Sequence, residues 1–269
     1  MDARQRSQYL EALGIDEWVP RNPVAAATGA AVAQTSPAMH PAAAAAAITP
    51  AAITLRAEIP PKPASGELSV ELAAQWSALR AEVGTCTRCA LHATRTQGVF
   101  GVGNELADWL VIGEAPGAEE DRRGQPFVGR AGQLLDAMLK SIGLGRETNV
   151  YIANVLKSRP PGNRDPKSEE VAACLPYLLR QIGLMRPRLI LAVGRIAAQN
   201  LLSTDMPLGR LRGKVHQFGE LNTPLIVTYH PAYLLRTPGD KRKAWEDLKF
   251  ARSVFRQLTQ GLGTLGDRT

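Results

Sequence analysis

The sequence predicts an α/β fold of three layers (α/β/α), in which helices cover both faces of a central parallel sheet. From about residue 67 onward, short apolar runs alternate with segments that carry apolar residues at helical spacing. Chains that alternate strand and helix in this way form parallel sheets buried on both faces. A long Ala- and Pro-rich stretch ahead of this region offers no periodic face to a core, so we expect a disordered N-terminal arm.

The chain therefore divides into four parts, which we expect to be a docking peptide, a disordered linker, a folded domain and a flexible tail, at residues 1–22, 23–66, 67–260 and 261–269. In the first part, Tyr9, Leu10 and Leu13 share one helical face, and Ile15 and Trp18 add apolar anchors. A segment this short does not fold alone, which favours binding in the groove of a partner protein.

Within the domain, four apolar runs are predicted as buried strands, at residues 109–113, 150–156, 189–194 and 225–230. Four segments with helical periodicity are predicted as helices, at residues 131–144, 168–184, 195–202 and 241–258. Asp165 and Pro166 mark the expected start of the second of these helices and Gly183 its end. Ligands of parallel sheets bind at the carboxyl ends of the strands, so the segments that follow the strands are the candidate site.

Composition limits the function classes. The 269 residues hold 32 Lys and Arg against 25 Asp and Glu, an excess that suits a polyanion such as nucleic acid or that serves solubility alone. No apolar run approaches the ~20 residues of a membrane span, and the N-terminus lacks the apolar stretch of a signal peptide. We expect a cytoplasmic monomer with no membrane attachment. Three cysteines in a reducing compartment argue against a disulfide framework.

The segments after the strands hold unusual polar and aromatic residues. In "GEAPG", the glycines shape a tight loop and Glu114 adds a carboxylate. In "QPFVG", Phe127 is either a plug for the end of the sheet or a stacking platform. Asn154 ends a buried strand, where its amide needs hydrogen-bond partners from the loop or from a ligand. His230, before a proline, is a structural or a catalytic histidine.

Four motifs, "GEAPG", "GQPFVGRAGQLLD", "NVLKSRPPGNRDP" and "TYHPAYLLR", in this order and spacing, resemble the family 4 uracil-DNA glycosylases, the iron-sulfur branch of their superfamily. The resemblance covers about residues 70–258. It implies a three-layer domain with a central parallel sheet. It also implies cleavage of the N-glycosidic bond of deoxyuridine in DNA, the first step of base excision repair.

The resemblance assigns a pocket for a flipped uracil to six residues, Gly113, Glu114, Ala115, Phe127, Asn154 and His230. Phe127 would stack on the base, and the Asn154 amide would contact its O4/N3 edge, a pattern that cytosine inverts. His230 would donate to O2, where negative charge develops as the bond breaks. A carboxylate near the sugar would orient water; Glu114 is the first candidate for this catalytic base, and Asp121 is the second. Family 1 enzymes carry Asp where this chain has Ala115.

Three residues of "HPAYLLR", namely Leu234, Leu235 and Arg236, are candidates to fill the gap left by the flipped base and to contact DNA phosphates. The alternative for the two leucines is a packing cluster at a helix start.

The family also implies a 4Fe-4S cluster on four cysteines. The corresponding positions here are Cys86, Cys89, Ser158 and Cys174, so three match and the fourth carries a hydroxyl. We expect a retained but labile cluster, with Ser158 as a harder fourth ligand. The alternatives are loss of the cluster, with thiols packed as small apolar groups, and a zinc site that uses the three cysteines and His92.

Two other functions compete with an active glycosylase. The first is a non-catalytic protein that keeps the fold to bind DNA or a replication partner. The second is the covalent uracil-trapping family, whose basic loop after the Asn-bearing strand carries a histidine; here that loop, "SRPPGNRDPKSEE", has none. The peptide within residues 4–20 resembles the segment by which the psi subunit of the bacterial clamp loader docks onto the loader, which makes the clamp loader a candidate partner.

Overall fold

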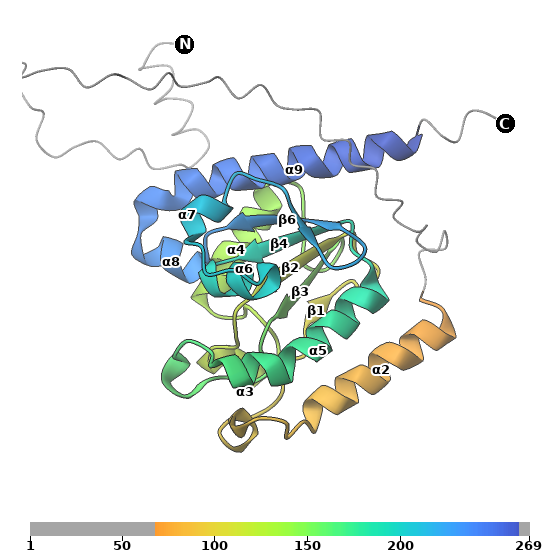
Figure 1. Ribbon diagram of the computed structural model, residues 1–269, viewed down its shortest axis with the longest axis vertical. Helices are drawn as coiled ribbons and strands as arrows, with labels where there is room; N and C mark the ends of the chain where they lie inside the picture. The colour runs from red at the N-terminus through yellow and green to blue at the C-terminus, as the bar shows by residue number, and fades with distance from the viewer. Residues whose placement is uncertain (1–67, 264–269) are drawn as a thin grey trace, which may run out of the picture. The chain divides into compact units, whose positions relative to one another are not determined.

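The computed structural model describes residues 68–263, so the predicted docking peptide and linker lie outside the described residues. Within this range, helices pack on both faces of a six-stranded sheet (Figure 1). Its strands lie in the order β1-β3-β2-β4-β6-β5. Their bounds are β1 Val102–Gly103, β2 Trp109–Gly113, β3 Val150–Asn154, β4 Leu189–Val193, β5 His216–Phe218 and β6 Thr223–Thr228.

The predicted central parallel sheet is confirmed, with a difference at its edges. The four predicted strands are β2, β3, β4 and β6, and each neighbouring pair among them is parallel. The short edge strands β1 and β5 pair antiparallel to β3 and β6, and the sheet is therefore mixed. Strands of two and three residues carry too little alternation to be recognised from the sequence.

The described helices have the following bounds: α2 Val70–Gly84, α3 Ala118–Arg123, α4 Arg130–Ser141, α5 Ser168–Met185, α6 Arg195–Leu202, α7 Leu208–Leu211, α8 Pro231–Arg236 and α9 Lys241–Gly263. α9 overlaps the first three residues of the predicted tail. None of the helices between residues 68 and 263 has the length and apolar content to span a bilayer.

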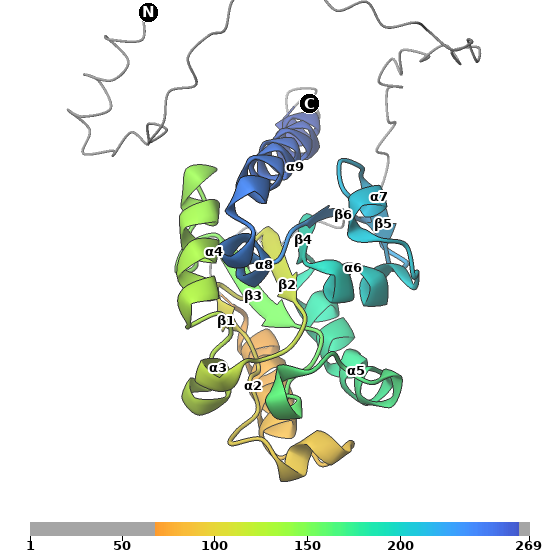
Figure 2. The same ribbon diagram turned by 90° about the vertical axis from the view of Figure 1, so that its left-hand side faces the viewer.

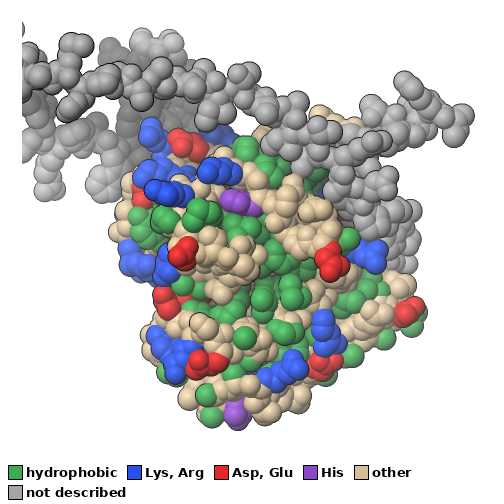
Figure 3. Space-filling view, in the orientation of Figure 1, with side chains coloured by type: hydrophobic (Ala, Val, Ile, Leu, Met, Phe, Trp, Pro, Cys, Tyr) green, Lys and Arg blue, Asp and Glu red, His purple; other side chains and the backbone are tan. Residues whose placement is uncertain are grey.

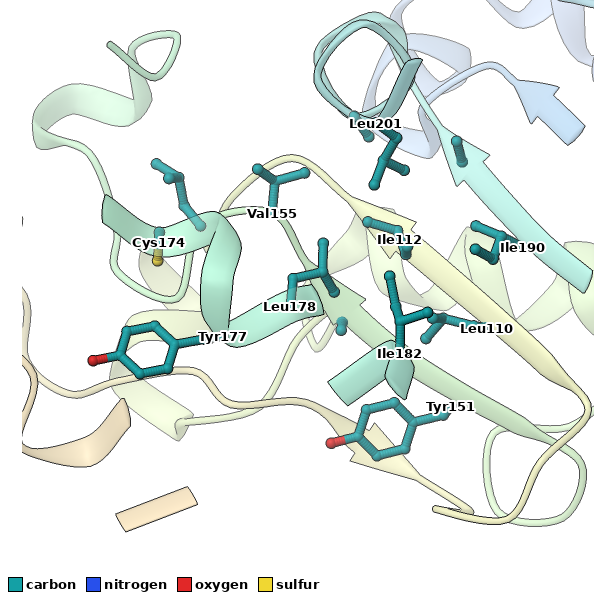
Figure 4. Close-up of a cluster of buried hydrophobic side chains, with 14 of the residues drawn as sticks. Leu110, Ile112, Tyr151, Val155, Cys174, Tyr177, Leu178, Ile182, Ile190 and Leu201 are labelled. Carbon is teal, nitrogen blue, oxygen red and sulfur yellow. The ribbon is translucent and has the colours of Figure 1, made fainter. Parts of the chain in front are cut away.

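Alternation along β2 separates the core into two layers. Leu110 and Ile112 pack in the cluster that contains α2, α5 and α6, whereas Trp109 and Val111 pack in the cluster that contains α4 and α9. Figure 2 shows these two groups of helices on opposite sides of the sheet. Figure 4 shows α5 side chains against β2, with Cys174 at the end of this cluster. The sheet is thus held rigidly from both faces, which fixes the loops at the strand ends.

The prediction for the ends of α5 was wrong. The helix begins at Ser168, because the Glu170 carboxylate accepts from the Lys167 amide and fixes the first turn there. Gly183 lies inside the helix, which continues to Met185 because that side chain is buried in the core. Burial of one large apolar side chain outweighs the ~1 kcal/mol that an interior glycine costs. Arg186 then ends the helix in the left-handed conformation.

Candidate active site

A cleft of about 1080 Å³ opens at the carboxyl ends of β2, β3 and β6. The helix after β2 and the helix after β4 cover opposite faces of the sheet, and these strands are neighbours, so the cleft lies where the winding changes direction. Five of the six predicted pocket residues line it, and they share it with loop residues after β3. The lining residues include Glu114, Ala115, Glu120, Phe127, Asn154, Pro160, Asn163, Arg164, Asp165, His230, Tyr233 and Arg236.

Phe127 is held in a strained backbone conformation at the cleft. Its φ angle is 54°, a left-handed value that non-glycine residues rarely adopt. The Arg146 guanidinium donates to the carbonyls of Pro126 (2.9 Å) and Phe127 (2.7 Å), and it also pairs with Asp136 at 2.9 Å. These bonds fix the peptide planes on both sides of the strained residue.

Glu120 fixes the same loop from its other end. One carboxylate oxygen accepts from the amides of Val128 (2.9 Å) and Gly129 (3.1 Å), the residues that directly follow Phe127. The ring therefore has one orientation, in which it packs in the core and also lines the cleft. The two interpretations of Phe127, plug and platform, describe the two sides of the same ring.

Gly113 lies behind the pocket and does not line it. A Cβ at this position would collide with Asn154 Oδ1 and with the Phe127 ring. Absence of a side chain at the end of β2 thus lets the aromatic ring and the amide pack directly against each other.

Asn154 carries an acceptor without a partner. The residue is 2% exposed at the last position of β3, and Oδ1 is buried with no hydrogen bond. An unsatisfied buried acceptor costs roughly 1–3 kcal/mol, so such an atom in a cleft wall is an arrangement that a donor on a ligand would satisfy.

His230 is a neutral donor to the cleft. It caps α8, and its Nδ1 accepts from the amide of Ala232 at 3.1 Å, which leaves the proton of the neutral ring on Nε2. Burial, assisted by the charge of Arg236, lowers the pKa of His230 to about 4. The ring centroid lies 5.5 Å from that of Phe127. At neutral pH the side chain therefore offers an N–H without a positive charge.

Glu114 is the titratable carboxyl group of the cleft. Burial raises its pKa to about 7, and the negative charge of Asp165 adds to this rise, whereas Arg195 opposes it. Arg195 donates to Asp165 at 2.8 Å, so a polar pair stands opposite Glu114. A carboxyl group with a pKa near neutrality is suited to accept a proton at physiological pH.

Comparison with known proteins agrees with this geometry. The sequence profile described as "Uracil DNA glycosylase superfamily" matches residues 100–249, which include the strands and loops that form the cleft. The chain belongs to the uracil-DNA glycosylase superfamily.

Several characterised members of this superfamily are similar to the chain over most of their length. The type-4 uracil-DNA glycosylase of Archaeoglobus fulgidus is 48% identical over 174 residues, which is 62% of this chain and 87% of that protein. The type-4 enzymes of Pyrobaculum aerophilum and Thermotoga maritima are 45% and 42% identical, over 61% and 64% of this chain and 86% and 90% of their own lengths.

The structure differs from the sequence-based assignment at two superfamily positions. Asp121 does not line the cleft; it is 4% exposed, and its carboxylate accepts from the backbone amides of Thr96 and Gln97, so it braces a loop. Leu234 is 1% exposed and packs in the core with α4, which makes it a packing residue.

Leu235 and Arg236 remain at the surface. Leu235 is 36% exposed, and Arg236 lines the cleft. Figure 3 shows Lys and Arg side chains along the edge of the molecule where α8 and the start of α9 lie in Figure 1. This edge adjoins the cleft through the Tyr233 hydroxyl, which donates to Asp240 at 2.6 Å.

The four cluster positions of the superfamily's iron-sulfur branch line one small cavity. Cys86, Cys89, Ser158 and Cys174 surround about 270 Å³ of space, together with His92. Cys174 Sγ accepts from the Lys157 amide at 3.0 Å. Among the described residues, no three Cys, His, Asp or Glu side chains are placed to hold a metal ion, so the ligand set of a single zinc ion is not assembled there.

Sequence reasoning missed Glu120 and Arg146, which position Phe127. Arg146 lies 19 positions after Phe127, in the loop that precedes β3, and nothing in the sequence links it to the ring. Glu120 stands in an acidic run that is typical of a solvated helix start. Only the positive φ of Phe127 indicates why its loop needs both.

Proposed function

We propose that this protein is a uracil-DNA glycosylase that accepts a uracil flipped out of DNA and hydrolyses its N-glycosidic bond. The observation that carries the proposal is the buried, unpartnered Asn154 Oδ1 beside the fixed ring of Phe127 and the neutral His230. A uracil stacked on the ring has an N3–H to donate to this acceptor, and cytosine presents an acceptor at the same position. Cytosine would therefore leave the Asn154 acceptor unsatisfied.

The remaining polar groups suit the charge changes of the reaction. As the bond breaks, negative charge develops on uracil O2 and positive charge develops on the sugar. The Nε2–H of His230 would donate to O2, and its low pKa favours a role as a neutral donor. The Glu114 carboxylate would take a proton from the attacking water and oppose the charge on the sugar. Leu235 and Arg236 would contact the DNA strand at the cleft entrance.

Incubation of purified protein with single- and double-stranded uracil DNA, followed by alkaline cleavage, tests the proposal. Strand breaks at the uracil positions, with free uracil released, are the expected result. A non-catalytic DNA-binding protein would leave the strand intact under alkali. The covalent trapping activity would give a protein–DNA adduct that migrates slowly in a denaturing gel.

We propose further that Cys86, Cys89 and Cys174 hold an iron-sulfur cluster, with Ser158 at the fourth position. Three thiols at one cavity are the ligand type that such clusters require, and the hydroxyl is a harder and weaker ligand, so we expect a labile cluster. When bound, the cluster would cross-link three segments of the chain. It takes no part in bond cleavage, because its cavity and the cleft share no lining residue.

The organisation predicted from the sequence completes the proposal. The residues within 4–20 would dock onto the replicative clamp loader, and the linker up to residue 66 would tether the glycosylase domain to it. The basic excess of the chain supports DNA as substrate. A cytoplasmic location and a monomeric state remain predictions.

A further inference from the structure

Arg95 connects the two sides of the thiol cavity. Its Nη1 donates to Ser158 Oγ at 2.8 Å, and its Nη2 donates to the carbonyls of Gly84 at 2.8 Å and Cys86 at 3.0 Å. The first acceptor follows β3, and the other two belong to the end of α2 and the C-x-x-C segment. One guanidinium thus joins two segments about 70 residues apart.

The residue at position 158 suits this contact. Ser158 is 4% exposed, so its hydroxyl needs a partner inside the protein. A guanidinium has only donors, and a hydroxyl oxygen is a much better acceptor for them than a thiol sulfur. Serine at this position therefore weakens metal ligation and strengthens the bond to Arg95 at the same time.

The segment held by Arg95 supports the uracil pocket. Its neighbour Lys157 is 1% exposed, and the ammonium donates to the Asn154 carbonyl at 2.9 Å and to Gln181 at 2.6 Å. The Lys157 carbonyl accepts from the amide of Val99 at 2.7 Å. Displacement of the loop at 158 would thus be transmitted to the end of β3.

We infer that Arg95 closes the thiol cavity at its fourth corner and supplies the cross-link that a fourth cysteine ligand would supply through metal. Metal–thiolate bonds hold such segments together in a four-cysteine site. Here the C-x-x-C segment and the β3 loop are joined by hydrogen bonds that need no iron. The inference rests on the proposed cluster only for the comparison of loaded and iron-free protein; the cross-link itself concerns the fold.

Thermal unfolding of the full chain, as isolated and after iron removal, tests the inference, with iron content measured in parallel. Arg95→Met removes all three bonds at similar side-chain length. In iron-free protein we expect Tm to fall by roughly 5–10 °C. In iron-loaded protein we expect a smaller fall, because the cluster ties the same segments.

Arg180→Met is the matched control. Arg180 makes two bonds to Glu82 and joins α2 to α5, but both side chains are about half exposed and lie outside the cavity. This variant should shift Tm by less than about 2 °C, equally with and without iron. An Arg95→Met shift no larger than the control shift, or one as large in loaded as in iron-free protein, would overturn the inference.

Two further variants cover the remaining outcomes. If Arg95→Met does not fold, Arg95→Lys keeps the charge but cannot reach all three acceptors, so it should show a smaller loss of Tm with the same dependence on iron. In a Ser158→Cys background that takes up more iron, Arg95→Met should have no effect beyond the control. If wild-type protein binds no iron, Arg95 is the sole cross-link, and the full fall in Tm must appear. Uracil excision is measured separately, so failure of the proposed function leaves these readouts intact.

Discussion

At the scale of single residues, the candidate site depends on two exceptions to ordinary folding rules. Asn154 leaves a buried acceptor unsatisfied, and Phe127 keeps a left-handed backbone. Each costs roughly 1–3 kcal/mol, and each is compatible with a stable fold because its surroundings are rigid. Both residues lie at the ligand-binding end of the sheet. Conformational cost located in one cleft indicates preorganisation for a ligand.

The acceptor predicts the effect of replacing Asn154. Asn154→Ala should lower the single-turnover rate of uracil excision by about 3 kcal/mol, or roughly a hundredfold, because one buried pocket contact is lost in the transition state. Affinity for DNA with an abasic site, which lacks the base, should stay unchanged. Asn200→Ala, on α6 outside the cleft, is the control. Wild-type-like turnover of Asn154→Ala would refute the pocket assignment.

The raised pKa of Glu114 predicts a pH profile. A general base acts when ionised, so log kcat/KM should rise with unit slope below about pH 7 and level off above it, where the carboxyl group is charged. His230, with a pKa of about 4, stays neutral across this range and adds no second limb. Glu114→Gln should be slower and lose the inflection. A flat wild-type profile from pH 5 to 9 would exclude Glu114 as the base.

At the scale of elements, how well the sequence predicts the structure depends on periodicity. The long strands and helices were predicted to within a few residues because a two-sided core imposes alternation on β2 and helical spacing on α4 and α9. Edge strands β1 and β5 were missed because they are too short to show a pattern. The loop that carries Phe127 was located by its Gly and Pro residues, but its supports come from distant elements. Contacts between distant elements leave no local signal.

Those supports make a prediction about the loop between α3 and α4. Arg146→Met removes the donors that hold the carbonyls around Phe127, and we expect kcat/KM to fall roughly ten- to a hundredfold as the strained conformation relaxes. Asp136→Asn is the matched control, because it weakens the ion pair of Arg146 and leaves both carbonyl bonds in place. A Tm loss similar in both variants, with activity reduced in neither, would show that the loop does not depend on Arg146.

At the scale of the whole molecule, the described domain contains every residue of the candidate site, whereas residues 1–66 contribute none of them. The first part of the chain nevertheless carries an apolar helical face and a tryptophan, which a disordered arm does not need. A short anchor followed by a flexible linker raises the local concentration of an attached enzyme to about millimolar. The arm is therefore expected to act on location and not on chemistry.

Deletion of residues 1–22 separates these two roles. The truncated protein should excise uracil from short oligonucleotides at the wild-type rate, because the site is complete without the arm, and it should lose the capture of clamp-loader subunits in a pull-down. Trp18→Ala in the full chain should reproduce most of this loss, since a buried aromatic anchor commonly contributes 2 kcal/mol or more to such a contact. Gln34→Ala, within the linker, is the control and should bind like wild type. Equal recovery of the subunits by truncated and full-length protein would exclude the tether, and slower excision by the truncated protein would show that the arm contributes to the domain itself.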